Sequence, residues 1–461
     1  MLKFIINNKI VETEKSAGMI LLDFIRNEEK LTGTKEACRE GECGACSVLI
    51  GKLNESGKME YKTCASCLLP IGDVKDCHIV TVEGLDMPDL TLVQRLIIEN
   101  SASQCGFCTP GIVLSLTGYC FSSDNFDYED AITALDGNIC RCTGYAAIRN
   151  AAKALSDSLL NNKNSDKNKR LELLADMEIV PKYFFDIPEK IKSLKSRCNQ
   201  DLNDDTAVVA GGTDLFVQKP DKLEDSKLYF MSGRSDLDYI KSDDSNLLIG
   251  GAVNLEEFRK SETVNKYFPQ MKNIILLHSS TILRNKATIA GNIVNASPIG
   301  DMSIILLVLN AALVIECKSR GLREVKLSEF YKGYKKYDLI GCEIIREIKI
   351  PKPSQNFYFN FEKVSNRKIL DIASVNSAVS IKFDGNNNME DLKISAGGVA
   401  PIPLLLKGFD EFTGKKINSE NIKKIAEFSV NQVAPIDDIR GSAKYKKLLL
   451  KQLILSHFEK F

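Results

Sequence analysis

The stretch Cys38-Arg-Glu-Gly-Glu-Cys43-Gly-Ala-Cys46 decides the fold of the first part of the chain. Gly41 and Gly44 let its backbone turn tightly, because glycine adopts positive φ at little steric cost. A further thiol follows at Cys67, and the spacing alone leaves Cys64 open as a second candidate for that position. Thiolates from one tight loop and one separate element approach a common point from several directions, so the stretch predicts a metal centre.

The surrounding residues predict a small β-rich domain over residues 1–84. Its C-x4-C-x2-C spacing with a distant fourth cysteine is that of plant-type ferredoxins, which hold a 2Fe-2S cluster. Residues 2–12 follow a strand, turn and strand pattern, residues 19–27 have helical spacing, and residues 47–50 have a strand pattern. Structural zinc is the alternative, because four cysteines also suit a tetrahedral ion.

A second thiol group pairs Cys105-Gly-Phe-Cys108 with Cys140-Arg-Cys142, about 30 residues later. Pro110 and Tyr145 open helical patterns, so both halves lie near helix starts, where partial positive charge and free N–H groups stabilise thiolates. Four helical segments between residues 92 and 160 predict a helical domain over 85–160. Zinc is again the alternative on spacing alone.

Composition excludes several classes of function. The chain has 61 basic and 61 acidic residues among 461, which gives no electrostatic footprint for nucleic acid or an anionic membrane. No signal peptide and no segment of transmembrane length is evident, so unprotected thiols indicate a reducing cytoplasm. The spare cysteines are expected to be small buried hydrophobic residues: Cys64, Cys77, Cys120, Cys198, Cys317 and Cys342.

Residues 161–169 are polar and almost without apolar side chains, and we predict an exposed linker over 161–178 before two further domains, 179–350 and 351–461. In the first of these domains, Ala207-Val-Val-Ala-Gly-Gly-Thr-Asp-Leu215 is a strand that enters a glycine-rich turn, whose amides can hold a pyrophosphate. A plain turn is the alternative, since this segment lacks the G-x-G-x-x-G of a Rossmann site. The segment from Arg284 to Asp301 is dense in small and hydrogen-bonding residues, which suits a backbone that lies against a large polar cofactor.

Several motifs together carry a resemblance that covers nearly the full length. The chain resembles the small iron-sulfur and flavin subunit of bacterial xanthine dehydrogenases, in the molybdenum hydroxylase family. The matching motifs occur in the family's order: Cys38 to Cys46, Ser66-Cys-Leu-Leu-Pro70, Gln104-Cys-Gly-Phe-Cys-Thr-Pro-Gly111, Gly137-Asn-Ile-Cys-Arg-Cys-Thr-Gly-Tyr145, Gly211-Gly-Thr-Asp214, Arg284 to Asp301, and Pro435 to Ala443 with Tyr445.

The resemblance implies an electron relay. A partner subunit would hold molybdopterin and oxidise hypoxanthine or xanthine, and electrons would pass through two 2Fe-2S clusters to FAD and then to NAD+. The implied assembly is a dimer of heterodimers with that larger subunit. The resemblance selects Cys67 over Cys64, because the family's fourth ligand precedes Leu-x-Pro. The implied cluster ligands are Cys38, Cys43, Cys46 and Cys67 in one set, and Cys105, Cys108, Cys140 and Cys142 in the other.

The resemblance also implies a set of FAD contacts and four folds. These are a β-grasp ferredoxin domain, a four-helix cluster domain, an α+β FAD domain of the vanillyl-alcohol-oxidase type, and a C-terminal α/β domain. Ala290 departs from the family, which usually has glycine there, and His278 stands where some relatives have an aromatic residue near adenine. The implied contacts are Val209, Ala210, Gly211, Gly212, Thr213, Asp214, Leu215, Thr288, Gly291, Asn292, Asp301 and Lys363.

Two rival functions remain open at this point. One is the equivalent subunit of a sister hydroxylase that acts on an aldehyde or an N-heterocycle. The other is a zinc-bearing scaffold protein without redox function. The presence of all eight cluster cysteines argues against this second rival. No residue is predicted to act as a general base, because a relay of this kind needs little acid-base catalysis from the chain.

Overall fold

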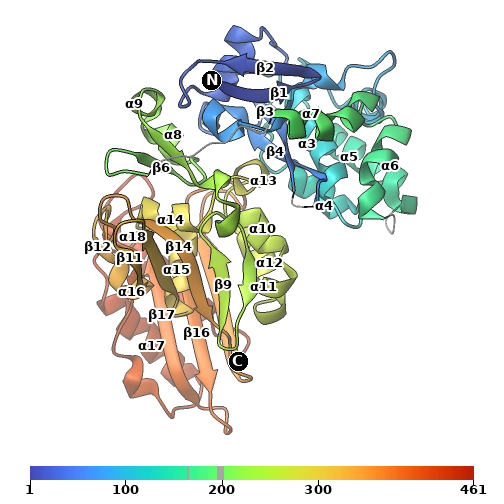
Figure 1. Ribbon diagram of the computed structural model, residues 1–461. Coiled ribbons are helices and arrows are strands. Elements are labelled where there is room, and N and C mark those ends of the chain that lie inside the picture. The colour runs from blue at the N-terminus through green and yellow to red at the C-terminus, as the bar shows by residue number, and fades with distance from the viewer. Residues whose placement is uncertain (55, 163–165, 195–201) are drawn as a thin grey trace. The chain divides into compact units, whose positions relative to one another are not determined.

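The computed structural model describes residues 1–54, 56–162, 166–194 and 202–461, and the chain divides into two units (Figure 1). Unit 1 comprises Met1–Asp201, Gly212–Phe230 and Ser280–Lys286, and unit 2 comprises Leu202–Gly211, Met231–Ser279 and Ala287–Phe461. Cys198 lies outside the described residues. No described helix is both long and apolar enough to cross a membrane.

Unit 1 begins with a mixed five-stranded sheet of order β2-β1-β5-β3-β4, in which only β1 and β5 are parallel. Its strands are β1 (Leu2–Ile6), β2 (Lys9–Thr13), β3 (Ser47–Leu53), β4 (Met59–Ala65) and β5 (His78–Val80). Phe4 packs edge-on against Phe24, where α1 (Leu21–Asp23) continues as a π-helical turn over Phe24–Glu28. The strand and helix patterns expected in residues 2–50 are therefore present.

Four helices follow over the range where four were expected: α2 (Leu92–Glu99), α3 (Thr109–Ser122), α4 (Tyr128–Ala134) and α5 (Ala146–Leu159). Thr91 begins α2 with a capping box, in which its hydroxyl and the Gln94 side chain each bind the other residue's backbone N–H. Helix α3 contacts both β3 and β4, and it is buried on most of its surface. The sheet and the helices therefore share one hydrophobic core.

The predicted exposed linker over 161–178 fails from Arg170 onward. Helix α6 (Arg170–Asp176) buries Leu174 completely. The Arg170 guanidinium lies 4.2 Å from the centre of the Phe126 ring and donates to the carbonyl oxygens of Cys120 and Ser123. The sequence concealed this packing because arginine can bury its stem while it satisfies its charged head.

Further elements of unit 1 come from segments after the expected linker. They are α7 (Ile187–Leu194), α8 (Leu215–Gln218), α9 (Pro220–Glu224), β7 (Leu228–Phe230) and α13 (Thr281–Arg284). Helix α7 buries Ile187, Ile191 and Leu194 against Ile5. Residues predicted for the third domain thus pack with the first two.

Unit 2 contains a five-stranded antiparallel sheet of order β11-β10-β14-β9-β8. The strands of unit 2 up to residue 351 are β6 (Ala207–Val209), β8 (Ile240–Ser242), β9 (Asn246–Gly250), β10 (Ala312–Cys317), β11 (Gly321–Lys326), β12 (Tyr331–Gly333), β13 (Lys336–Tyr337) and β14 (Ile344–Pro351). Its helices in the same range are α10 (Leu255–Lys260), α11 (Glu262–Tyr267), α12 (Met271–Ile274), α14 (Ile289–Asn295), α15 (Asp301–Val308) and α16 (Leu327–Phe330).

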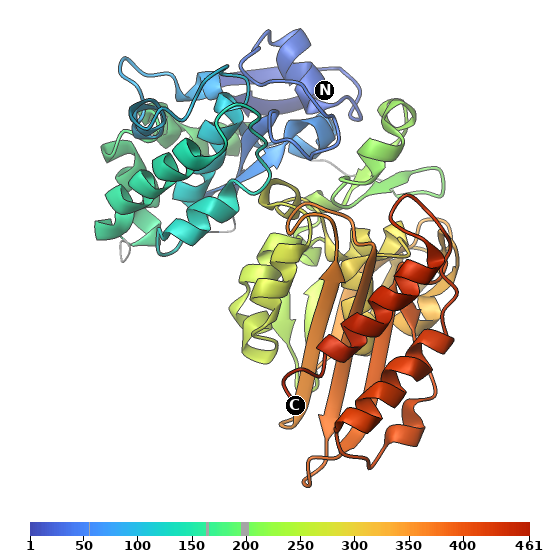
Figure 2. The same ribbon diagram turned by 180° about the vertical axis from the view of Figure 1, so that it is seen from behind.

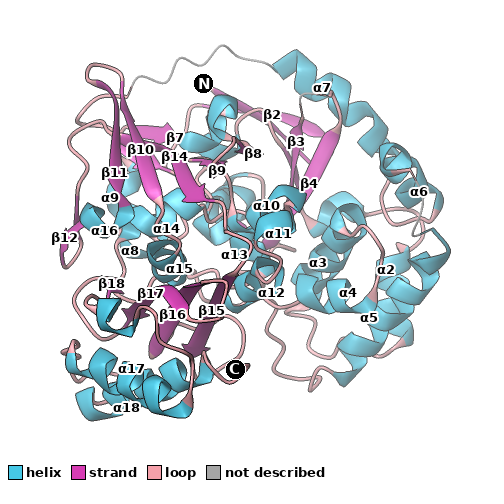
Figure 3. Ribbon diagram, turned by 90° about the horizontal axis from the view of Figure 1, so that it is seen from below, coloured by secondary structure: helices cyan, strands magenta, loops and turns pink. Residues whose placement is uncertain are grey.

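The C-terminal part of unit 2 is an antiparallel sheet of order β15-β16-β17-β18 with two helices on one face (Figures 2 and 3). Its elements are β15 (Phe357–Val364), β16 (Val375–Phe383), β17 (Met389–Gly397), β18 (Leu404–Leu405), α17 (Ser419–Asn431) and α18 (Ala443–Ser456). The prediction of an α/β domain here is wrong, because that class has a parallel sheet and every described pairing in this sheet is antiparallel.

Helix α15 is buried on all sides and joins the two larger sheets of unit 2 into one core. Every residue from Asp301 to Val308 is buried, and the helix contacts β16 and β17. Its apolar residues share a core cluster with Leu313 of β10 and Ile348 of β14. A helix that is apolar all round requires such an interior position.

Candidate functional site

The first cysteine loop, residues 38–46, turns tightly and packs closely against its neighbours. Gly41 and Gly44 have φ of 74° and 66°, in the left-handed region that glycine tolerates. A Cβ on Gly41 would come within 2.6 Å of the side chains of Leu68 and Leu283, and one on Gly44 would meet Gly137 O at 2.6 Å. Both glycines are therefore required by the close approach of neighbouring elements as well as by conformation.

The thiols of the first set meet two by two. Cys38 interacts with Cys43 through their side chains, and Cys46 interacts with Cys67 in the same way. The hydrogen bond from Cys43 lowers the pKa of Cys38 to about 5, which favours its thiolate. Among the described residues, no group of three His, Cys, Asp or Glu side chains surrounds one point. Pairs of thiols are the arrangement that a diiron centre needs, since each iron takes two protein ligands.

The structure distinguishes the two candidates for the fourth position. Cys67 lies in a 3-10 turn, Ser66–Leu68, where it faces Cys46. Cys64 lies on β4 with its side chain in the core beside Val48 and Ile79, and burial raises its pKa to about 11. The geometry therefore favours Cys67, which spacing alone did not select.

The second set also consists of two thiol pairs. Cys142 Sγ lies 3.4 Å from Cys105 Sγ, and Cys108 interacts through its side chain with Cys140. Cys108 is the N-cap residue of α3. Cys140 is held near the start of α5, because its N–H donates to Tyr145 Oη at 3.0 Å. Tyr145 adopts φ of 69° as it enters α5, a conformation that the sequence pattern did not indicate.

Hydrogen bonds join the two cysteine loops directly. Ile139 N donates to Cys43 O at 3.0 Å, and Asn138 Nδ2 donates to Gly44 O at 3.2 Å. Gly111 of α3 approaches Gly44 O so closely that no Cβ would fit there. A direct hydrogen bond therefore joins the residue before Cys140 to Cys43 itself, a link that sequence reasoning missed because it depends on how α3 packs.

The two cysteine sets differ in exposure. Cys46 and Cys67 are buried, whereas Cys105 and Cys142 are exposed. Apolar side chains next to the second set are also exposed, with Phe107 at 46% and Ile139 at 45%. Cys105 and Cys142 therefore lie at the surface of unit 1 next to exposed apolar side chains, although Cys140 of the same set is buried.

The residues predicted to contact FAD fall in both units. Val209, Ala210 and Gly211 belong to unit 2, whereas residues 212–215 belong to unit 1. Within unit 2, a Cβ on Gly291 would lie 3.5 Å from Ala210 Cβ and 3.9 Å from Gly211 N. The glycine-rich turn and the start of α14 are thus neighbours there, as a shared cofactor requires.

The start of α14 has a capped N-terminus and a polar atom that lacks a partner. Thr288 Oγ1 accepts from Gly291 N at 2.9 Å. Asn292 Oδ1 is buried, and no described residue provides it with a hydrogen bond. Such an unsatisfied buried atom fits a bound polar group. Ala290 instead packs in the core with Ile293, so its methyl group lies away from this polar side of the helix.

Asp301 and Lys363 form a buried ion pair, although they are 62 residues apart. Lys363 Nζ donates to Asp301 Oδ2 at 2.8 Å, and Asn376 Nδ2 donates to Asp301 Oδ1 at 2.6 Å. His278 Nδ1 lies 3.4 Å from Asp301 Oδ2, so His278 accompanies the ion pair. Lys363 also lines a cavity of about 300 Å³ together with Leu277 and residues 364–368. No pattern in the sequence predicted a role for Asn376.

We expect Asp301 to make stability depend on acid pH. Burial opposes its ionisation, but Lys363 and His278 outweigh burial and lower the pKa of Asp301 to about 2, against about 3.9 in an unfolded chain. A depressed pKa contributes stability above the unfolded value that is lost as pH falls, here about 2–3 kcal/mol lost between about pH 4 and pH 2.

Urea unfolding of the full chain at pH 7 and pH 3 measures this dependence. The Asp301→Asn variant should lose less stability over that interval than the parent chain. The matched control is Asp391→Asn, whose carboxylate is 52% exposed and which should leave the pH dependence unchanged. Equal pH dependence in the parent chain and Asp301→Asn would contradict the assignment.

Known domain families match the parts of the chain that carry the cysteine sets and the glycine-rich turn. Four family models match in sequence: a 2Fe-2S iron-sulfur cluster binding domain over residues 4–72, a [2Fe-2S] binding domain over 81–153, an FAD binding domain in molybdopterin dehydrogenase over 183–353, and a CO dehydrogenase flavoprotein C-terminal domain over 360–461. The four matches follow one another along the chain without overlap.

Two relatives named as xanthine dehydrogenases align with almost the whole chain. Xanthine dehydrogenase 1 of Arabidopsis thaliana is 27% identical over 96% of this chain and 38% of its own length. The xanthine dehydrogenase/oxidase of Rattus norvegicus is 28% identical over 99% of this chain and 38% of its own length. The chain therefore spans well under half of either relative.

Two solved structures share the fold of part of the chain. Carbon monoxide dehydrogenase from Hydrogenophaga pseudoflava superimposes with a TM-score of 0.52 at 24% identity, covering 55% of this chain and 88% of its own. Quinoline 2-oxidoreductase from Pseudomonas putida 86 gives a TM-score of 0.52 at 24% identity, covering 56% and 89%. These likenesses concern the fold alone.

Proposed function

We propose that the chain is the electron-transfer part of a xanthine dehydrogenase. It would receive electrons from a molybdopterin-binding partner that oxidises hypoxanthine or xanthine, and it would deliver them to NAD+. The observation that carries the proposal is the joining of two four-thiol sites by one backbone hydrogen bond, from Ile139 N to Cys43 O. Two metal centres in direct backbone contact suit the transfer of electrons better than they suit two independent structural sites.

The cysteines are proposed as ligands of two 2Fe-2S clusters. In each site the thiols meet in two pairs, which matches the two irons of such a cluster. The chain's own contribution is to hold the loops rigid and to aim donors at the sulfurs. For example, Glu40 N donates to Cys38 Sγ at 3.4 Å, and such contacts tune a cluster's potential.

The exposed set of cysteines is proposed to face the partner. Cys105 and Cys142 lie at the surface of unit 1, next to exposed Phe107 and Ile139. Apolar side chains around an exposed metal site suit burial by another subunit. We propose the molybdopterin-binding subunit as that partner, in a dimer of heterodimers, and a reducing cytoplasm as the compartment.

FAD is proposed to bind through the glycine-rich turn and the start of α14. Gly211, Gly291 and the unpartnered Asn292 Oδ1 supply a backbone approach and a polar contact. The pair of Asp301 and Lys363 would hold fixed charge at the same site. A bound flavin would accept electrons singly and pass on two together, which would couple the one-electron clusters to NAD+. The matched FAD-binding domain and the five-stranded sheet of unit 2 support the vanillyl-alcohol-oxidase type of fold, and the mixed sheet of unit 1 supports the β-grasp type.

An anaerobic titration of the full chain with NADH tests the proposal. We expect NADH to bleach the flavin absorbance and to generate two distinct 2Fe-2S signals in low-temperature electron paramagnetic resonance. Signals that appear with dithionite but not with NADH would contradict nicotinamide as the acceptor. No iron signal with either reductant would overturn the relay and favour zinc.

A sister hydroxylase is the second candidate function. The two xanthine dehydrogenases described above are no more than 28% identical to the chain. The two solved structures are named for other substrates, carbon monoxide and quinoline. The substrate would be fixed by the partner, so copurification of the partner and an assay with xanthine, an aldehyde and nicotinate would separate the two candidates.

A further inference from the structure

Cys317 and Cys342 form a close thiol pair in unit 2 that the proposed relay does not use. Cys317 is the last residue of β10, and its Sγ lies 3.2 Å from the Sγ of Cys342, 25 residues later in the chain. Both were expected to be inert buried residues. At this separation the two sulfurs are in direct contact, so their chemistry is shared.

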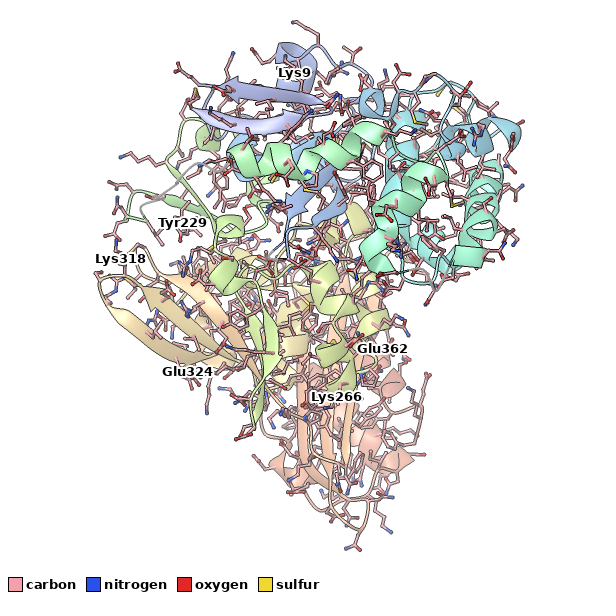
Figure 4. The ribbon with its side chains drawn as sticks, turned by 45° about the vertical axis from the view of Figure 1, so that its right-hand side comes forward. Lys9, Tyr229, Lys266, Lys318, Glu324 and Glu362 are labelled. Carbon is pink, nitrogen blue, oxygen red and sulfur yellow. The ribbon has the colours of Figure 1, made fainter. Side chains whose placement is uncertain are left out.

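The two segments that carry the thiols are tied together by arginines of the β10–β11 hairpin, to which Cys317 itself belongs. Arg320 Nη2 donates to Ile340 O at 2.5 Å. Arg323 Nε and Nη2 donate to the two carboxylate oxygens of Glu343 at 3.0 and 2.7 Å. Lys318, labelled in Figure 4, marks the turn between β10 and β11 of this hairpin. The thiols are therefore brought together by fixed backbone.

The Cys342 side of the pair is fixed independently. Cys342 N donates to Asp204 Oδ1 at 2.9 Å. Gly341 adopts φ of 55°, and a Cβ there would collide with the Asp204 carboxylate. Only glycine lets the chain pass this close to Asp204, and the passage sets the direction of Cys342.

The environment makes one thiol of the pair a nucleophile. Cys317 Sγ lies 3.2 Å from Ser319 Oγ, and hydrogen bonds from Ser319 and then Cys342 lower the pKa of Cys317 to about 7. The thiolate is the reactive form of cysteine toward oxidants. Cys342 is partly exposed, which provides access to the buried Cys317.

We propose that Cys317 and Cys342 are a reversible redox pair that closes to a disulfide in the presence of a hydroperoxide. The Cys317 thiolate attacks one peroxide oxygen, the O–O bond breaks, and a sulfenic acid and water result. The Cys342 thiol then attacks that sulfur, so the S–S bond forms as the S–O bond breaks and a second water leaves. Two thiols thus lose two electrons and two protons, and one hydrogen peroxide becomes two waters.

Peptide mapping of the full chain tests the proposal. The reduced chain is treated with an equimolar amount of hydrogen peroxide, free thiols are blocked with N-ethylmaleimide, and the digest is examined by mass spectrometry. We expect a cross-linked peptide that joins Cys317 to Cys342 in most molecules and that disappears after dithiothreitol. Full alkylation of both residues after peroxide would overturn the proposal.

Two variants separate this pair from the other cysteines. Cys342→Ser should abolish the cross-link and leave a Cys317 sulfenic acid that dimedone captures. Cys77→Ser is the matched control. Cys77 is as buried as Cys317 but lies in another core, where burial raises its pKa to about 11. Cross-linking that survives in Cys342→Ser, through a different thiol, would contradict the assignment. The readout is confined to these peptides, so it does not depend on the clusters or on flavin.

Discussion

Replacing Cys43 with alanine is expected to remove one of the two 2Fe-2S signals and to cut NADH-dependent reduction of the remaining cluster by more than about 100-fold. Removal of a group that only supports a metal ligand typically lowers metal affinity or activity by about 10–100-fold. Cys43 is proposed as a ligand itself, so a larger effect is expected. Its carbonyl oxygen also accepts the hydrogen bond from Ile139 that joins the two sites. Iron content and electron paramagnetic resonance of the dithionite-reduced chain measure the loss directly.

Cys64→Ala and Cys67→Ala provide the matched comparison. Cys64 lies in the core away from the other thiols, so its removal should leave both signals intact. Cys67 faces Cys46, so its removal should have the same effect as the change at Cys43. Two intact signals in Cys43→Ala, or the loss of one in Cys64→Ala but not in Cys67→Ala, would overturn the ligand assignment.

Replacing Arg284 with methionine should destabilise unit 1 by about 3–5 kcal/mol, because it leaves the buried carboxylate of Asp136 without its charge partner. Arg284 is fully buried, and its Nη2 donates to Asp136 Oδ2 at 2.8 Å. Burial raises the pKa of Asp136 even with Arg284 present, so loss of the guanidinium removes the main interaction that favours its charge. The free energy of unfolding in urea measures the effect.

Two further variants complete this test. Arg149→Met changes an exposed arginine of the same unit and should alter stability by less than about 0.5 kcal/mol. The double variant Arg284→Met/Asp136→Asn should be more stable than Arg284→Met alone, since it removes the unpaired charge. If the double variant were the less stable of the two, the buried ion pair would not be the cause of the loss.

The cysteine patterns predicted which thiols come from one loop, because chain spacing largely determines which thiols share a loop. Cys38, Cys43 and Cys46 lie on one loop for that reason. The partner thiol on another element depends on how β4 ends: Cys67 reaches Cys46 only because the chain turns at Ser66–Leu68, which spacing cannot reveal. The resemblance to a family supplied that choice before the structure supported it.

Other features depended on tertiary packing and were beyond pattern reasoning. Helix α6 follows directly on a polar stretch, and the interactions of Arg170 with Phe126 and two carbonyl oxygens hold it in place. Asn376 stands among apolar residues of β16, and only the position of α15 brings it to Asp301. In both cases a polar residue in an unremarkable context acquires its role from a distant element.

The unequal burial of the two cysteine sets has a practical consequence for work with the purified chain. Chelators and oxidants reach exposed thiolates before buried ones, and Cys105 and Cys142 are exposed whereas Cys46 and Cys67 are buried. We therefore expect the two metal sites to differ in durability. A preparation that ages without its partner should pass through a form that retains metal at the Cys38 loop alone, so the age of a sample becomes a variable in every spectrum recorded from it.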